Sequence, residues 1–418
     1  MANNRFLEQL KSNSLFIKNF TYLSLVEVIN IIVPFIILPY LITTLGKSNY
    51  GLVIFAQSVI IYFTILQNFG LNTYAIKEIS INSKAKNKLS SIVSNVISVK
   101  FILFFINLLL LYALTFVFPV IGENKLLFFL SMWVCFFDII FPRWYFQGVE
   151  KMKWITYVFF ISKLSSLILI FTLVESPEDY IKVPVIYAFG SLFPSIGSLF
   201  IIFKKDQLKF SIPRIESLKT TTKQSLNFFI SEVSIAVFAN SNKVIIGSVL
   251  GMVELAYYDL ADKIITTFRN VPLTIVRDSI YPRVAKTKNL QIVVKTTKIM
   301  SVYAILVVTF IFLFAPYMIR ILGGEDMATS ILVLKLFSFA ILTTHISNYF
   351  ITVGLWSMGY EKTFRNLMVY STVLFLCLIV VLWIGNWMNI YTLTFLPVIV
   401  DIYLIIHTYY IYKKEKLF

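Results

Sequence analysis

Charged residues are scarce in this chain, and their scarcity sets its class. Only 14% of the 418 residues are Asp, Glu, Lys or Arg, whereas 58% are hydrophobic, and the mean hydropathy is +0.82. A soluble domain carries about 25% charged residues and about half apolar ones. Apolar side chains in this excess cannot all be buried in a core surrounded by water. The composition therefore predicts an integral membrane protein whose apolar side chains face lipid.

Cysteine and histidine are almost absent, which argues against disulfide frameworks, metal sites and histidine-based proton transfer. The two cysteines, Cys135 and Cys377, lie inside apolar runs and are too few for a disulfide framework. We expect the two histidines, His345 and His407, to be hydrogen-bonded structural side chains rather than ligands or proton relays. The sequence shows no metal-ligand cluster, no carboxylate pair with catalytic spacing and no glycine loop that would cradle a phosphate. No catalytic residue, metal site or cofactor is predicted.

Long apolar runs, in contrast, recur along the whole chain. Each is about 20 residues long, which as a helix crosses about 30 Å of hydrocarbon. A helix is the expected element because it satisfies its backbone hydrogen bonds internally in lipid. The fold class is therefore all-α integral membrane. We predict twelve transmembrane helices, over residues 20–42, 51–73, 94–118, 125–145, 155–174, 183–203, 226–249, 255–275, 299–321, 329–352, 367–386 and 391–411.

The net charge of +16 lies mostly in short connections between these runs, so we read it as a topology signal and expect no nucleic-acid partner. Of the 37 Lys and Arg residues, 27 lie in the termini and the alternate connections that share their side, and 4 lie on the other side. Because connections rich in Lys and Arg stay in the cytoplasm, we predict that both termini are cytoplasmic.

The connection 204–225 is the longest on the inner side and divides six spans from six. Similar sequence follows the first span of each half, where Leu45-Gly46 and Leu250-Gly251 precede further apolar runs. Repeats of six spans share one orientation in the membrane. We predict two six-helix lobes, 1–203 and 226–418, related by a pseudo-two-fold axis along the membrane normal, with 204–225 as a cytoplasmic linker and a cleft between the lobes.

Polar side chains inside the predicted spans indicate where a cargo would pass. The predicted helix 255–275 places six of them on one face: Asp259, Asp262, Lys263, Thr266, Arg269 and Asn270. A polar stripe of this length cannot face lipid. Two interpretations stay open: the stripe lines a water-filled cavity, or Asp259–Lys263 and Asp262–Thr266–Arg269 satisfy one another as an internal ladder. Lys100, which begins an apolar run, is expected to extend towards the membrane interface.

A cavity with cations and amides suits a cargo that carries a diphosphate and sugars, because Lys and Arg are the natural partners of phosphate oxygens. The candidate substrate-binding residues are Lys243, Lys263, Arg269, Lys335, Arg143, Asn240, Gln57 and Asn68. If a proton or sodium gradient supplies energy, the candidate ion-coupling carboxylates are Asp138, Glu232, Asp259 and Asp401.

Several stretches resemble a known family. The run 37–51, Ile-Leu-Pro-Tyr-Leu-Ile-Thr-Thr-Leu-Gly-Lys-Ser-Asn-Tyr-Gly, is similar to the opening of O-antigen flippases, and so is 68–71, Asn-Phe-Gly-Leu. The most specific match is 142–152, Pro-Arg-Trp-Tyr-Phe-Gln-Gly-Val-Glu-Lys-Met, and 245–247, Ile-Ile-Gly, also fits. The chain thus resembles the Wzx-type O-antigen and polysaccharide flippase family, a branch of the multidrug/oligosaccharidyl-lipid/polysaccharide flippase superfamily.

This resemblance implies a transporter of the bacterial inner membrane rather than an enzyme. It implies movement of undecaprenyl-diphosphate-linked oligosaccharide from the cytoplasmic to the periplasmic leaflet by alternating access. Expected partners are this glycan, membrane lipids, a polysaccharide polymerase and a chain-length regulator. A multidrug cation antiporter of the same superfamily is the alternative, which the lysines disfavour. A polysaccharide-assembly membrane enzyme is less favoured, because the outer connections are too short for a catalytic domain.

Overall fold

The computed structural model describes residues 2–415, except for the side chains of 2–27, 30, 31, 152, 155, 231, 238, 275, 278 and 282. Every regular element within these described residues is helical. The all-α class predicted from the sequence is therefore confirmed.

Nine segments of the described chain are long and apolar enough to cross a membrane: Ile32–Asn68, Lys86–Val117, Lys125–Gly148, Thr156–Leu173, Pro177–Lys205, Leu290–Gly323, Thr329–Trp356, Glu361–Ile384 and Ile390–Lys414. The first two predicted spans fall on one helix, α1 (Ala2–Asn68). The seventh and eighth fall on α10 (Ile215–Ile245) and α11 (Met252–Thr287), which carry charged residues at their centres. A multi-span membrane protein is thus confirmed, while the count of twelve spans stays a prediction.

Helix α1 contains two helical stretches that meet at Gly46, whose φ of 72° and ψ of 164° are not helical. An L side chain rarely adopts such a positive φ, and glycine does so without steric cost. Gly46 therefore lets the chain change direction within one nearly continuous helical segment.

Residue contacts divide the chain into two compact units. The first unit comprises Met1–Leu45 and Ala56–Glu232, and the second comprises Gly46–Phe55 and Val233–Phe418. The second unit thus includes ten residues that follow the break in α1. The predicted lobe bounds, 1–203 and 226–418 with a linker over 204–225, stay a prediction.

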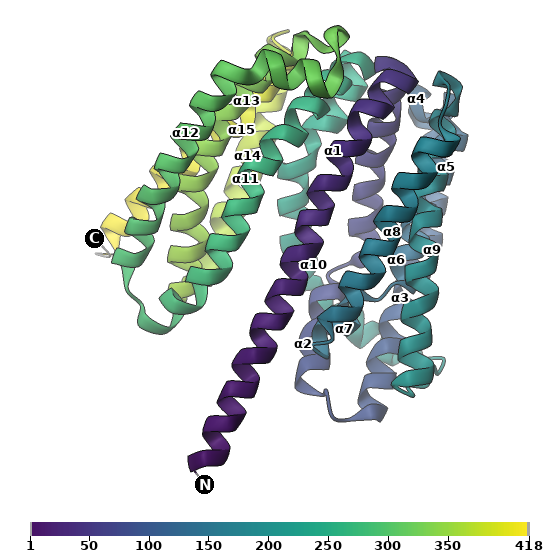
Figure 1. Cartoon of the computed structure of the whole chain (residues 1–418), viewed down its shortest axis with the longest axis vertical. Helices are drawn as coiled ribbons and strands as arrows, with labels where there is room; N and C mark the ends of the chain where they lie inside the picture. Colours follow the sequence, from purple (N-terminus) through teal and green to yellow (C-terminus); the bar gives the residue numbers. More distant parts are fainter. Residues whose placement is uncertain (1, 416–418) are drawn as a thin grey trace. The chain divides into compact units, whose positions relative to one another are not determined.

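In the first unit, α9 (Lys182–Phe200) packs against α8 (Met152–Leu173), α6 (Trp133–Ile140) and α5 (Lys125–Ser131), as Figure 1 shows. Helix α2 (Leu71–Ile81) packs against α7 (Arg143–Gly148) and α3 (Lys86–Val117). The short helix α4 (Pro119–Glu123) follows α3, and a 3-10 turn, η1 (Pro177–Ile181), precedes α9. A π-helical turn, η2 (Ile201–Lys205), follows α9.

In the second unit, α13 (Thr329–Asn348) is the central helix. It packs against α11, α12 (Leu290–Gly323) and α15 (Ile390–Lys414), while α14 (Glu361–Ile384) packs against α15 (Figure 1). Its apolar side chains Val333, Leu334 and Phe337 are therefore buried. The remaining elements are the π-helical turns η3 (Ile246–Leu250) and η5 (Tyr349–Trp356) and the 3-10 turn η4 (Glu325–Met327).

Large apolar side chains also point outward in both units. Leu109 and Phe116 of α3, and Leu313 of α12, are each about two-thirds exposed or more. Surfaces of this kind aggregate in water but are solvated by lipid tails in a bilayer. The outward apolar faces agree with the membrane class inferred from composition.

Candidate functional site

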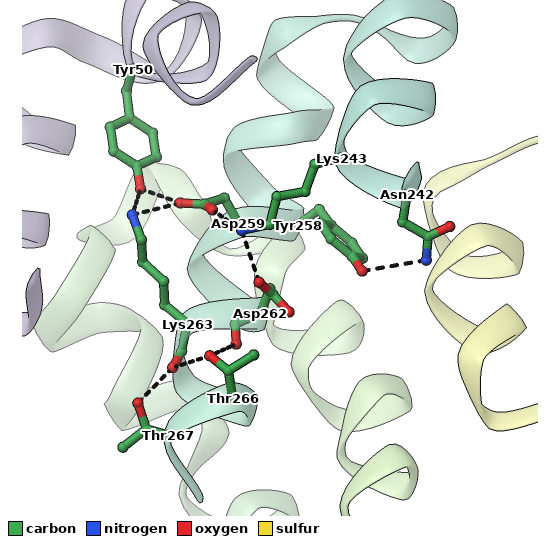
Figure 2. A network of polar contacts seen from close by, with 9 residues as sticks. All are labelled: Tyr50, Asn242, Lys243, Tyr258, Asp259, Asp262, Lys263, Thr266 and Thr267. Atoms are coloured by element: carbon green, nitrogen blue, oxygen red, sulfur yellow. Dashed lines mark hydrogen bonds and ion pairs between the residues drawn. The ribbon is translucent and has the colours of Figure 1, made fainter. Parts of the chain in front are cut away.

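Five side chains of the second unit form an ion-pair network, shown in Figure 2. Lys243 Nζ of α10 lies 2.7 Å from Asp259 Oδ1 and 2.8 Å from Asp262 Oδ2, both on α11. Lys263 Nζ, one turn beyond Asp259, lies 2.7 Å from Asp259 Oδ2. The Tyr50 hydroxyl of α1 donates to Asp259 Oδ2 and accepts a hydrogen bond from Lys263 Nζ at 2.7 Å.

Two lysines and two aspartates make this network formally neutral, and Asp259 is its buried centre. The Asp259 side chain is 1% exposed, whereas those of Lys243 and Lys263 are 19% and 27% exposed. Removing a carboxylate from water is costly unless cations and hydrogen-bond donors replace its hydration. Both Asp259 oxygens have such partners, so the network can be held within a membrane-spanning unit.

Two glycines bring the three helical segments of the network together. Gly251, whose φ is 113°, separates η3 from α11 and allows the chain to turn back after Lys243. Gly51 lies against Met252, and a Cβ atom at Gly51 would overlap the Met252 backbone carbonyl. Because no side chain intervenes at Gly51, the neighbouring Tyr50 reaches the first turns of α11.

The ladder predicted along α11 is correct in its first half and wrong in its second. Asp259 and Lys263 do pair with each other. Asp262 pairs with Lys243 instead of Arg269, because α10 supplies a nearer ammonium group. Arg269 donates through Nε to Asn270 Oδ1 at 3.3 Å. The network therefore combines a pair along α11 with pairs made between α10 and α11.

The other three predicted substrate-binding cations, Lys335, Arg269 and Arg143, differ in whether a carboxylate lies nearby. Lys335 Nζ of α13 lies 5.8 Å from the centre of the Phe312 ring. Neither Lys335 nor Arg269 forms an ion pair with any side chain that the structure describes. Arg143, at the start of α7 in the first unit, is 49% exposed and lies 3.8 Å from Asp138 Oδ1. Lys335 and Arg269 thus keep cationic charge available, whereas Lys243 and Lys263 are neutralised by their neighbours.

Contrary to the expectation from the sequence, the Lys100 side chain does not extend towards the membrane interface. Its side chain is fully buried, and its Nζ lies 3.0 Å from Asp138 Oδ2. The expected extension towards the interface is wrong because Asp138, on the neighbouring helix α6, provides a buried counter-charge.

The three predicted amide contacts do not join the ion-pair network. Asn240 donates to the Ala236 carbonyl oxygen one turn earlier in α10, at 3.1 Å. Gln57 is half-buried in α1, and Asn68 ends that helix. The Asn68 Oδ1 atom is buried without a hydrogen-bond partner among the described residues.

Two of the predicted ion-coupling carboxylates have no cation within 4.0 Å among the described side chains. Glu232 accepts a hydrogen bond from Thr73 at 3.0 Å in the first unit. Asp401 of α15, 5% exposed in the second unit, accepts from three hydroxyl groups of α13. Its donors are Thr343, Thr344 and Ser347, at 3.1, 2.6 and 3.3 Å. The other two carboxylates, Asp138 and Asp259, are paired with lysines.

Sequence reasoning missed Tyr50, the pairing of Asp262 with Lys243 and the hydroxyl groups around Asp401. Tyr50 is 209 residues from Asp259, and no periodicity connects the two positions. His345 was expected to be hydrogen-bonded, and that expectation is wrong. It is fully buried, and both ring nitrogens have no hydrogen-bond partner among the described residues. Its ring instead packs between those of Tyr303 and Tyr349, each centred 5.8 Å away.

Comparison with known proteins shows which family the chain belongs to. The family model described as "Polysaccharide biosynthesis protein" matches residues 16–288. The "Putative O-antigen transporter" of Escherichia coli (strain K12) is 25% identical over 368 residues, which cover 87% of this chain and 88% of the relative.

Two solved structures show the same fold at low sequence identity. One is a multidrug resistance MATE family transporter of the MOP superfamily in an inward-facing conformation. It has a TM-score of 0.70 and 15% identity, with 92% of this chain and 98% of that chain covered. The other is the lipid II flippase MurJ in an inward closed conformation. It has a TM-score of 0.70 and 13% identity, with 93% and 87% covered.

Three findings lead to one conclusion: the family model matches 273 of the 418 residues, a relative is named as a transporter, and the described chain contains long apolar helices. This chain belongs to the polysaccharide biosynthesis protein family and is a multi-pass membrane transporter rather than an enzyme.

Proposed function

We propose that this protein flips an undecaprenyl-diphosphate-linked oligosaccharide, an O-antigen or capsule repeat unit, from the cytoplasmic to the periplasmic leaflet of a bacterial inner membrane. In this proposal the chain spans the membrane twelve times, both termini are cytoplasmic, and transport follows alternating access. The curated relative named as an O-antigen transporter and the fold shared with a lipid II flippase support this cargo class. A polymerase and a chain-length regulator are the proposed protein partners.

The observation that carries the proposal is the neutral ion-pair network of Lys243, Asp259, Asp262 and Lys263. A diphosphate is a strong acceptor for ammonium groups. When the cargo arrives, its phosphate oxygens can replace carboxylate oxygens around the lysines, so each exchange retains a counter-charge. Lys243 is the natural exchange point because it is shared between two carboxylates.

The unpaired cations provide the first attraction for the cargo in this proposal. Arg269 and Lys335 form no ion pair among the described side chains, so their charge is available to a phosphate. Arg269 lies seven residues beyond Asp262 on α11, which places it about two turns along the same helix. The cargo would meet Arg269 or Lys335 first and the paired lysines afterwards.

Coupling to a proton or sodium gradient is assigned to Asp401 in this proposal. A carboxylate buried among three hydroxyl oxygens is stabilised either by a proton or by a hard cation, which prefers oxygen ligands. Binding or release of that proton or cation on α15 would be the step that couples the gradient to transport.

Complementation of a bacterial strain that lacks its own O-antigen transporter tests this function. Wild-type protein should restore surface polysaccharide, and Arg269→Ala should reduce it at equal abundance in the membrane. Lys362→Ala is the matched control, because Lys362 is exposed at the start of α14. No polysaccharide with wild-type protein, together with increased resistance to cationic drugs, would instead establish the multidrug antiporter.

A further inference from the structure

The first unit contains a cavity of about 570 Å³ whose lining includes none of the candidate site residues. Its walls come from Phe69, the residue after α1, from α3, and from the first turns of α10. The volume lies within the range of about 300–1,000 Å³ that is typical of small-molecule sites. The cavity is therefore large enough to hold a ligand.

The interior of this cavity is apolar. Val99 and Leu103 of α3 line it together with Leu218 and Leu226 of α10, and Val99 is only 5% exposed. Water gains few hydrogen bonds in such surroundings, whereas a hydrocarbon chain fills them favourably. The natural occupant of the interior is therefore an alkyl chain.

Two lysines give the same cavity a cationic edge. Lys219 and Lys223 are exposed on α10, one turn apart, and neither forms an ion pair with a side chain that the structure describes. With Leu218 and Leu226 they occupy one face of the helix, because the four residues are spaced i, i+1, i+5 and i+8. A helix face that joins leucines to lysines suits the boundary between lipid tails and head groups.

The walls are fixed by specific contacts rather than by loose packing. Asn95 of α3 donates to the hydroxyl groups of Ser217 and Thr221, at 2.8 and 3.3 Å. Directly after α1, the Phe69 ring stacks on Phe229 of α10, with ring centres 4.2 Å apart. These contacts hold this part of α10 against α3 and against the residue that follows α1.

We propose that this cavity binds an anionic phospholipid of the surrounding membrane. One acyl chain occupies the space between α3 and α10, and the phosphate contacts Lys219 and Lys223. Two neighbouring lysines beside an apolar cavity favour anionic over zwitterionic head groups, since each lysine adds electrostatic attraction at the membrane surface. The cavity is too small for a whole undecaprenyl chain, so membrane phospholipid is the better match. This site does not depend on the identity of the transported cargo.

Native mass spectrometry of the purified full chain tests the assignment. Phosphatidylglycerol and phosphatidylcholine with identical acyl chains are added at equal concentration, and the number of molecules of each lipid bound per protein is measured. We expect phosphatidylglycerol to bind about thirtyfold more tightly, from two lysines at the head group. In the double variant Lys219→Gln/Lys223→Gln this preference should disappear. The matched control is Lys84→Gln/Lys88→Gln, an exposed pair with the same spacing outside the cavity, which should keep it.

A second variant separates the acyl chain from the head group. Thr222 lines the cavity, so Thr222→Phe should fill it and reduce retention of both lipids. Equal retention of the two lipids by the wild-type protein would overturn the proposal, as would an unchanged preference in the Lys219/Lys223 double variant. Displacement of bound phosphatidylglycerol by an equimolar amount of undecaprenyl phosphate would assign the site to the cargo lipid and would also overturn it.

Discussion

Lys263 and Asp259 are held together one turn apart on α11, with Nζ and Oδ2 separated by 2.7 Å, and the Tyr50 hydroxyl contacts both groups. The pair is not isolated, because Lys243 of α10 binds the second oxygen of Asp259. Lys263, a predicted substrate-binding cation, is thus neutralised by its neighbours. Its charge becomes available only if a partner is exchanged.

Asp259→Ala should be the most destabilising change in the network. It removes the one carboxylate that contacts both lysines and leaves Lys263 without a counter-charge in a partly buried position. Breaking a buried ion pair in this way costs about 3–5 kcal/mol. The thermal unfolding midpoint in detergent should fall clearly. Glu325→Gln is the control: it breaks the exposed Arg320–Glu325 pair, worth about 0–1 kcal/mol. Equal midpoints for the two variants would contradict the central role of Asp259.

Neutrality of the network should matter more than any single member. Lys263→Met leaves two carboxylates around Lys243, whereas Lys263→Met/Asp262→Asn leaves one lysine facing one aspartate. We expect the double variant to recover membrane abundance relative to Lys263→Met, because an uncompensated buried charge costs more than a lost pair. Abundance is measured by quantitative blotting of membranes. A double variant less abundant than the single one would show that charge balance is not the controlling factor.

Gly51 should tolerate no side chain. A Cβ atom there would overlap the Met252 backbone, so Gly51→Ala must shift α1 against the start of α11. Overpacking of this kind costs about 1–3 kcal/mol and would move Tyr50 away from Asp259. Surface polysaccharide should fall in the complementation assay. Gly197→Ala is the matched control because its Cβ would meet nothing within 4 Å. Full activity of Gly51→Ala would exclude a tight approach at this position.

Asp401→Asn should separate transport from the ion gradient. The amide retains the shape of the side chain but can neither release a proton nor hold a cation as a carboxylate does. We expect transport by this variant to lose its dependence on an imposed proton or sodium gradient, while protein abundance is retained. Glu415→Gln, an exposed carboxylate beyond the end of α15, is the control. A gradient response in Asp401→Asn equal to that of the wild type would remove Asp401 from the coupling proposal.

The sequence was informative wherever a property depends on one helix at a time. Composition and long apolar runs predicted the helical membrane class, and the i, i+4 spacing gave the Asp259–Lys263 pair as one of two interpretations of the polar stripe. Partners supplied by another helix were not predictable in this way. Asp262 pairs with Lys243 and not with Arg269, and Lys100 pairs with Asp138. Tyr50 donates a hydrogen bond to Asp259, which lies 209 residues away in the sequence. These choices depend on how helices pack, and sequence spacing does not contain that information.

Translocation in proteoliposomes tests the central claim most directly. Purified protein is reconstituted with an undecaprenyl-diphosphate-linked oligosaccharide that carries a fluorophore, and the fraction accessible to an external quencher is followed over time. We predict that wild-type protein exchanges the labelled lipid between leaflets far faster than protein-free vesicles do, and that Arg269→Ala slows this exchange at equal protein density. Exchange by the wild-type protein at the rate of empty vesicles, with and without an ion gradient, would contradict the proposed flippase.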